Sequence, residues 1–138
     1  VDWSDVREQL RYMTLRASIA LDGRTIITFE QVFEYSQYNS PKSHQAFLDK
    51  LQNVLPNNTC PIIASDAGFR NTCFRQVQEK SWFWLGRVRG EVSIKQQDKP
   101  WVSNKTFYPN AVHKPKYLGY CFLAKRSPIP CEAYVYKG

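Results

Sequence analysis

Hydrophobic and polar residues alternate near the start of the chain. Between Arg11 and Leu21 every second position is apolar, which is the period of a half-buried β-strand; these positions are Met13, Leu15, Ala17, Ile19 and Leu21. The Asp22-Gly23 pair that follows predicts a tight type I′ turn, because that turn needs positive φ angles. Arg24 to Phe33 is then expected to return as the partner strand. With Val1-Asp2-Trp3 as the tail of a first strand and a polar loop from Ser4 to Gln9, the pattern predicts an antiparallel meander.

The spacing of apolar residues next changes to that of a helix. A polar connection from Tyr35 to Ser43 precedes it, and Ser43 is a suitable N-cap residue. The apolar stripe consists of Phe47, Leu48, Leu51, Val54 and Leu55. Pro56-Asn57-Asn58 is expected to end this helix.

A strand, a turn, a helix and a second strand are predicted from Ile62 to Val88. The apolar run Ile62 to Ala64 is typical of a buried strand and ends in Ser65-Asp66, where Gly68 permits a sharp turn. Phe69 to Lys80 has helical spacing, and Trp82 to Val88 reads as another buried strand; one helix face carries Cys73, Phe74 and Val77. The resulting order is β-β-β-α-β-α-β, which predicts an α/β fold with a mixed sheet and helices packed on its faces.

From Gly90 onward the pattern is weaker. Glu91 to Pro115 is polar, with a short strand expected around Val92 and Ile94. Tyr117 to Ala124 and Glu132 to Tyr136 have strand-like composition. We therefore expect two parts, an α/β core over residues 1–90 and a β-rich subdomain over residues 91–138.

Composition narrows the class of protein. The chain has 138 residues, 43% of them hydrophobic, which fits one globular domain. No apolar run approaches the roughly 20 residues of a membrane span, so no membrane partner is expected. The four cysteines, Cys60, Cys73, Cys121 and Cys131, lack the spacing of a zinc site, and we expect reduced thiols in a cytoplasmic protein. Because the chain starts without Met, we expect a fragment of a longer protein.

Charge is distributed unevenly along the chain. Residues 1–81 hold nine basic and nine acidic residues, whereas residues 82–138 hold ten basic and three acidic residues and carry the whole net charge of +7. Such an excess favours a polyanionic partner, with nucleic acid first. A solvated basic surface explains the same count equally well.

Two aspartates are the candidate catalytic and metal-binding residues. Asp2 is expected to end the first strand and Asp66 ends the fourth, so both carboxylates would meet if these strands are neighbours. Paired carboxylates at one sheet edge suit Mg²⁺, with Mn²⁺ as a substitute, and such a site can cleave phosphodiesters. The alternative is that each Asp only forms a turn or a cap, which is the commoner role of a single Asp at a strand end.

Several short motifs together resemble a known family. They are Asp2-Trp3-Ser4-Asp5, the Asp22-Gly23-Arg24 hairpin, Ser65-Asp66-Ala67-Gly68-Phe69-Arg70, Gly86-Arg87-Val88-Arg89-Gly90, Leu118-Gly119-Tyr120 and Ser127-Pro128-Ile129-Pro130-Cys131. In this respect the chain resembles the DDE transposases of bacterial cut-and-paste insertion sequences. The resemblance implies an RNase H-like fold with a β-rich insertion after the fifth strand.

The resemblance also implies a reaction. A site of three acids would cleave DNA at the transposon ends, form a hairpin and join the end to target DNA, with Asp2 and Asp66 as the first two acids. The third is a Glu in a Tyr-x-x-Arg-x-x-x-Glu motif, which this sequence lacks; neither Glu91 nor Glu132 has that motif around it. We therefore expect a catalytic-core fragment that is inactive alone, from a bacterial, nucleoid-associated protein that works as a homodimer or a higher synaptic assembly.

Basic and aromatic residues are the candidate DNA contacts. Arg70 follows Asp66 by four residues at a helix start, where a phosphate could bind. Arg87 and Arg89 are expected on one face of strand five. Lys114, Lys116 and Trp101 lie in the insertion. Each of the arginines and lysines can instead be a solvated or salt-bridged surface residue, and Trp101 can instead be a packing residue. His44 and His113 are expected at the surface.

Two other classes stay open. The chain can be a non-catalytic nucleic-acid-binding remnant that keeps an RNase H-like fold, and the missing third acid favours this reading. It can also be a hydrolase that shares the sheet.

Overall fold

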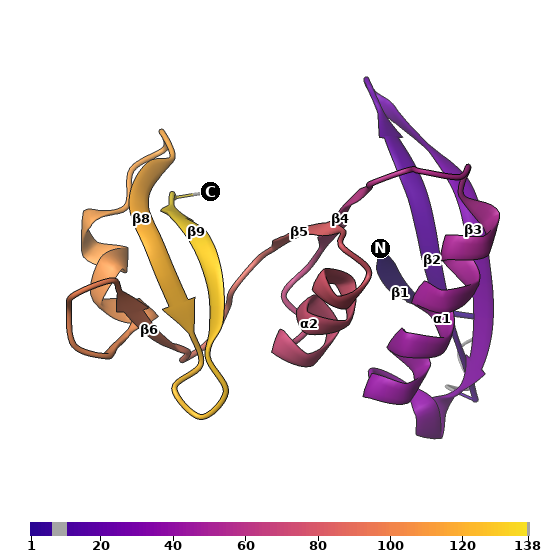
Figure 1. Cartoon of the computed structure of the whole chain (residues 1–138), viewed down its shortest axis with the longest axis horizontal. Coiled ribbons are helices and arrows are strands. Elements are labelled where there is room, and N and C mark those ends of the chain that lie inside the picture. Colours follow the sequence, from indigo (N-terminus) through magenta and orange to yellow (C-terminus); the bar gives the residue numbers. More distant parts are fainter. Residues whose placement is uncertain (7–10, 138) are drawn as a thin grey trace. The chain divides into compact units, whose positions relative to one another are not determined.

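The computed structural model describes residues 1–6 and 11–137 and has an α/β fold with several sheets (Figure 1). The chain divides into two compact units, Val1–Arg87 and Val88–Gly138. The first unit contains β1 (Asp2–Asp5), β2 (Tyr12–Leu21), β3 (Arg24–Glu34), the 3-10 helix η1 (Tyr35–Gln37), α1 (Pro41–Val54), β4 (Ile62–Ser65), α2 (Asn71–Glu79) and β5 (Phe83–Gly86). The second contains β6 (Ser93–Gln96), β7 (Val102–Ser103), the 3-10 helix η2 (Asn104–Asn110), β8 (Lys116–Leu123) and β9 (Ile129–Val135).

The order of strands and α-helices in the first unit is β-β-β-α-β-α-β, as the sequence predicts. Strands β1, β2 and β3 form an antiparallel sheet in that order, with Leu21 opposite Arg24 across the hairpin. Only Gly23 of the two turn residues has a positive φ, 72°, so the predicted type I′ turn is wrong. A glycine is still favoured, because this turn places its second residue in the left-handed region.

Strand β1 differs from the prediction. Asp2 does not end it; the strand runs from Asp2 to Asp5 and pairs with β2 over its whole length, from Asp2–Arg16 to Asp5–Met13. The pairing continues because β2 offers a partner at each of these positions. The predicted loop from Ser4 to Gln9 is therefore wrong for its first two residues, and its residues 7–9 lie outside the described part of the chain.

Helix α1 begins earlier than predicted. Its N-cap is Ser40, whose side-chain oxygen accepts from the Ser43 N–H at 3.1 Å. Pro41 occupies the first helical position, where its fixed φ suits a helix and its missing N–H costs nothing. The predicted cap Ser43 instead lies inside the first turn and donates its hydroxyl to the Gln37 carbonyl at 2.8 Å. The predicted stripe buries Phe47, Leu48 and Leu51, whereas Val54 is half exposed.

Strands β4 and β5 form a parallel pair that α2 covers on one face. Ile63 is buried, and Phe74 of α2 stacks on Trp84 of β5 at a centroid distance of 4.2 Å. A Cβ at Gly86 would lie 2.3 Å from Phe74 Cζ, so this close approach requires a glycine. The prediction that both strands are fully buried is wrong, since the residues pointing away from α2 are about two-thirds exposed: Ile62, Phe83 and Leu85.

The second unit contains an antiparallel sheet with the order β7-β6-β8-β9. Its core is small and consists of Ile94, Cys121, Leu123 and Ile129. The expected β-rich character is confirmed, but β9 begins at Ile129 rather than at Glu132. None of the helices in the described ranges is long and apolar enough to cross a membrane.

Candidate functional site

The loop after β4 holds Asp66 in a defined turn. The Gly68 N–H donates to Asp66 Oδ1 at 2.8 Å, and Asn39 Nδ2 donates to the Gly68 carbonyl at 2.9 Å. The second bond ties this loop to the segment before α1. Asp66 thus stabilises a turn, which is the alternative to metal binding that the sequence allows for this residue. The turn engages one carboxylate oxygen, and the Asp66 residue as a whole is exposed.

A hydrogen bond joins the segments that carry the two aspartates. The Val1 nitrogen donates to the Ala64 carbonyl of β4 at 2.5 Å, so the start of β1 lies beside β4 (Figure 1). This contact joins the edge of the antiparallel sheet β1-β2-β3 to the parallel pair β4-β5, which form separate sheets. Asp2 directly follows Val1, and Asp66 lies two residues after Ala64, so this contact joins the two acidic segments.

Electrostatics at Val1 agrees with this placement. Burial lowers the pKa of the Val1 amino group, while Asp2, Cys73 and Asp66 act to raise it. Both carboxylates are therefore within electrostatic reach of one atom. The structure brings together the two segments for which the sequence predicts a shared site.

Asp2 lies on the sheet face that the helices leave open. Its neighbour Trp3 packs against Phe33 and Tyr38 on the helix side, with ring centroids 5.5 and 5.3 Å away. Because successive side chains of a strand point to opposite faces, Asp2 faces away from α1, and it is exposed. A cation at Asp2 would be accessible from solvent.

His44 of α1 connects both acidic segments. Trp3 Nε1 donates to His44 Nε2 at 3.1 Å, and the His44 ring lies 5.1 Å from that of Phe69, three residues after Asp66. Burial lowers the pKa of His44 to about 4, so the imidazole that accepts this bond is neutral. The prediction of a surface His44 is wrong, because the residue is only 4% exposed. Its spacing of three from Phe47, in the buried stripe of α1, is the signal that places it inside.

The donors fit a hard divalent cation. Carboxylate oxygens are the ligands that Mg²⁺ and Mn²⁺ prefer, and both aspartates are exposed. In residues 1–6 and 11–137 no group of three or more His, Cys, Asp or Glu side chains has the arrangement of a metal site.

Of the three arginines predicted to contact DNA, Arg70 lies where the sequence predicts, whereas Arg87 and Arg89 do not. Arg70 directly precedes α2 and is exposed, as expected for a residue beside the Asp66 loop. The placement of Arg87 and Arg89 on a strand is wrong, since β5 ends at Gly86. The ladder stops there because β4 itself ends at Ser65, opposite Gly86. Both arginines are exposed, and the division into units falls between residues 87 and 88.

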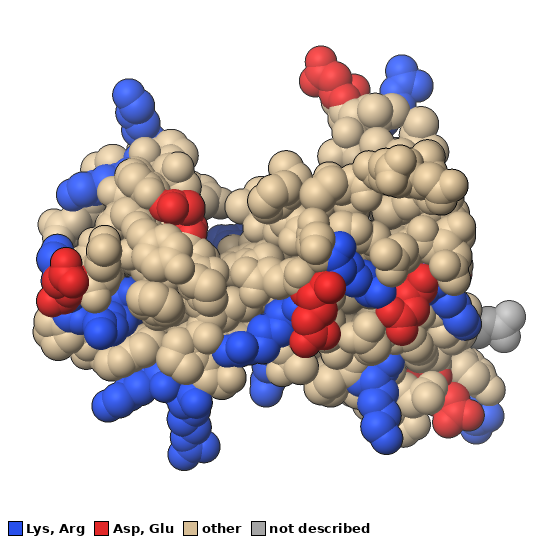
Figure 2. Space-filling model, viewed as in Figure 1, with Lys and Arg blue, Asp and Glu red and all other residues tan. Residues whose placement is uncertain are grey.

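The second unit carries most of the positive charge. Residues 88–138 include nine basic and three acidic residues, a net charge of +6. Figure 2 shows Lys and Arg side chains projecting from the unit that contains β8 and β9. Lys114 and Lys116 are exposed and adjoin the start of β8, while Trp101 is half-buried just before β7.

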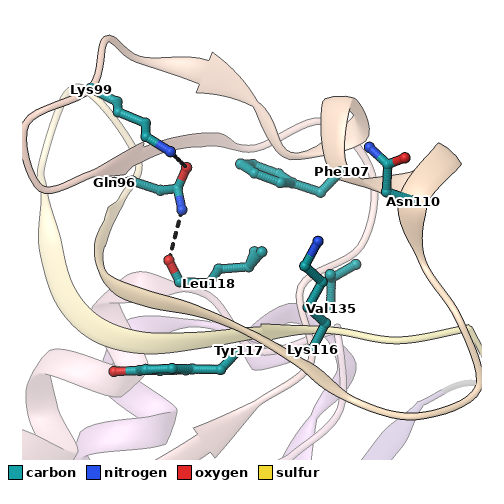
Figure 3. A pocket seen from close by; sticks show the side chains of 8 residues that line it. All are labelled: Gln96, Lys99, Phe107, Asn110, Lys116, Tyr117, Leu118 and Val135. Atoms are coloured by element: carbon teal, nitrogen blue, oxygen red, sulfur yellow. Dashed lines mark hydrogen bonds between the residues drawn. The ribbon is translucent and has the colours of Figure 1, made fainter.

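A polar pocket in the second unit is lined in part by Lys116, one of the predicted DNA contacts. It has a volume of about 330 Å³ and is lined by Gln96, Lys99, Phe107, Asn110, Lys116, Tyr117, Leu118 and Val135 (Figure 3). Gln96 is fixed between Lys99 Nζ, which donates to it at 3.1 Å, and the Leu118 carbonyl, to which it donates at 2.7 Å. The sequence does not single out Lys99 as a pocket residue, because a lysine in a polar segment has no distinguishing pattern.

The cysteines are poor candidates for catalytic or metal-binding residues. All four cysteines are free, and burial raises the pKa of the Cys73 and Cys131 thiols to about 12. The predicted packing of Cys73 in the α2 core is confirmed by its 5% exposure. Thiols with such high pKa values are weak nucleophiles and poor metal ligands at neutral pH.

Comparison of the chain with models of protein families, with characterised proteins and with solved structures finds no match.

Proposed function

We propose that the chain forms the catalytic core of a DNA transposase of the DDE type, with an RNase H-like sheet and a β-rich insertion. The observation that carries the proposal is the Val1–Ala64 hydrogen bond, which sets the strand of Asp2 beside the strand that leads to Asp66. The element order β-β-β-α-β-α-β supports it, as does the position of β1 at the edge of its sheet, beside β4. The resemblance of the short motifs supplies the reaction class.

In this proposal the carboxylates of Asp2 and Asp66 would hold Mg²⁺, or Mn²⁺ in its place. Such an ion would supply Lewis-acid chemistry, activating a water and neutralising charge on the leaving oxygen. The protein orients the DNA. Arg70, on the loop that carries Asp66, would contact a phosphate near the acids, and the lysines of the second unit would bind the duplex without reading its sequence.

The third acid of the family has no counterpart in these 138 residues. Two carboxylates suffice to hold a divalent ion weakly, but the family reaction uses three. We therefore expect this chain to bind metal and DNA and not to cleave DNA by itself. Nicking of supercoiled plasmid by the chain alone, abolished in Asp2→Asn, would instead favour a hydrolase.

A second candidate is a non-catalytic DNA-binding domain. The net charge of +6 in residues 88–138 favours it, because a basic surface alone gives sequence-independent affinity. This candidate differs from the first in one respect. Its affinity for DNA owes nothing to a divalent cation at Asp2 and Asp66.

Metal dependence of DNA binding separates the two. We would measure the Kd of a fluorescent duplex by anisotropy, at constant ionic strength, with and without Mn²⁺. The transposase core predicts tighter binding with Mn²⁺, and loss of that gain in Asp66→Asn. Asp22→Asn, which changes a carboxylate at the hairpin tip, is the matched control and should keep the gain. Equal binding with and without Mn²⁺ would support the non-catalytic domain.

A further inference from the structure

Three charged residues form a row across the first sheet. Asp2 of β1 pairs directly with Arg16 of β2, and Arg16 pairs directly with Glu30 of β3. Direct cross-strand partners share one face of a sheet and have Cβ atoms about 4.5–5.5 Å apart. The intervening Leu15 is 1% exposed on the helix side. The row therefore lies on the open face, the same face as the Asp2 carboxylate.

Within this row the arginine pairs with only one of its two acidic neighbours. Arg16 Nε donates to Glu30 Oε1 in an ion pair whose side chains are 41% and 39% exposed. Asp2 is equally a direct neighbour of Arg16 along the ladder, and no ion pair between these two occurs in the described residues. Arg16 thus makes its ion pair with Glu30, while the exposed Asp2 makes none in the described residues.

The bond to Glu30 uses one donor of the arginine. A guanidinium has five N–H donors in a planar fork that matches two oxygens of one phosphate. An arginine beside a carboxylate that holds a metal ion would meet the non-bridging oxygens of a phosphodiester bound to that ion. A lysine could give the charge but not the fork.

We propose that Arg16 binds the phosphate of the DNA held at Asp2 and Asp66, and that Glu30 positions Arg16 for this contact. The inference rests on the proposed function, since it needs a phosphodiester at the paired aspartates. It adds a residue to the site that no sequence motif indicates. The competing description is an ordinary surface ion pair, which contributes little to stability and nothing to DNA binding.

The test uses the whole chain and a fluorescent duplex in the presence of Mn²⁺. For Arg16→Ala we expect the Kd to rise about fivefold or more, because a charge-assisted contact to phosphate is lost. Arg16→Lys should recover only part of the affinity. The matched control is Arg24→Ala, which removes an arginine at the tip of the same hairpin and should change the Kd less than about twofold.

Two further variants distinguish a failure of the Arg16 inference from a failure of the proposed function. In Asp66→Asn the effect of Arg16→Ala on the Kd should shrink, because both residues act on the same phosphate. In Glu30→Gln the released guanidinium should turn to Asp2 and weaken Mn²⁺ binding measured by calorimetry. An Arg16→Ala protein that binds DNA as the wild type does, while its Mn²⁺-dependent gain persists, overturns this inference and leaves the proposed function standing. If the wild type shows no Mn²⁺-dependent gain, both fail.

Discussion

The two units of the chain differ in how they are stabilised and in what they carry. Within the described residues, unit Val1–Arg87 buries thirteen apolar side chains, and its sequence has ten basic and nine acidic residues. Unit Val88–Gly138 buries four and has a net charge of +6. In the described residues, the first unit has two α-helices packed on its strands, whereas the second has only the short 3-10 helix η2 beside its strands.

We propose that this difference reflects a division of roles between the two units, with the metal site in the first and DNA contacts in the second. A metal site needs ligands that stay in place, and the packed unit holds Asp2 and Asp66 through β1, β4 and the buried His44. Contacts to DNA phosphates need charge more than rigid placement, and the thin second unit supplies it. The following predictions test whether the two roles separate in this way.

The largest effect is expected in the core of the first unit. Phe47 has no exposed surface, and its ring lies 5.1 Å from that of Phe29. Phe47→Ala should lower the free energy of unfolding by about 3–5 kcal/mol, because it removes apolar contacts and leaves a cavity. Val54→Ala, on the same helix but half exposed, should cost less than about 1 kcal/mol. Urea denaturation followed by circular dichroism measures both, and equal losses would contradict the core described here.

The second-largest expected effect is a pH dependence of the free energy of unfolding that arises from His44. Its pKa in the folded state is about 4, below the usual 6.5. Between pH 6.5 and pH 4 the unfolded chain takes up a proton that the folded chain does not, so stability falls as the pH falls through this window. A shift of this size corresponds to about 3 kcal/mol, fully present above pH 6.5. His44→Gln should remove most of this slope in denaturation curves measured from pH 7 to pH 4, and an unchanged slope would contradict a buried neutral imidazole.

Local patterns predict the first unit better than the second. The alternation from Met13 to Leu21 and the stripe at Phe47, Leu48 and Leu51 specify elements that the structure contains. Each of these signals is set by residues near one another in sequence. In the second unit β9 starts at Ile129, although Pro130 argues against a strand there. Proline is tolerated because β9 is the edge of the order β7-β6-β8-β9.

Other features depend on tertiary neighbours, and the local pattern of hydrophobic and polar residues does not predict them. The end of β5 at Gly86 is set by the length of β4, so Arg87 lies outside the strand. The exposure of Phe83 follows from α2 covering only one sheet face. The neighbourhood of Asp2 and Arg16 follows from strand register, which no local motif encodes. For the candidate site, the sequence therefore indicates the two acids but not their basic neighbour.

The smallest effect concerns the salt dependence of DNA binding. Lys125 and Arg126 are exposed between β8 and β9. If each contacts a phosphate, Lys125→Ala with Arg126→Ala should reduce the slope of log K against log salt by about 2, since each contact contributes about 0.9. Lys42→Ala with Lys50→Ala removes the same charge from α1 of the first unit, where both residues are exposed, and should leave the slope nearly unchanged. Equal reductions in both variants would contradict the division of roles.

The paired aspartates are tested most directly by calorimetric titration of the chain with Mn²⁺. We expect the wild-type chain to bind Mn²⁺, and both Asp2→Asn and Asp66→Asn to bind it at least about tenfold more weakly, because each removes a ligand of the same ion. Asp22→Asn should bind as the wild type does. Wild-type affinity in either the Asp2 or the Asp66 variant would contradict a shared site.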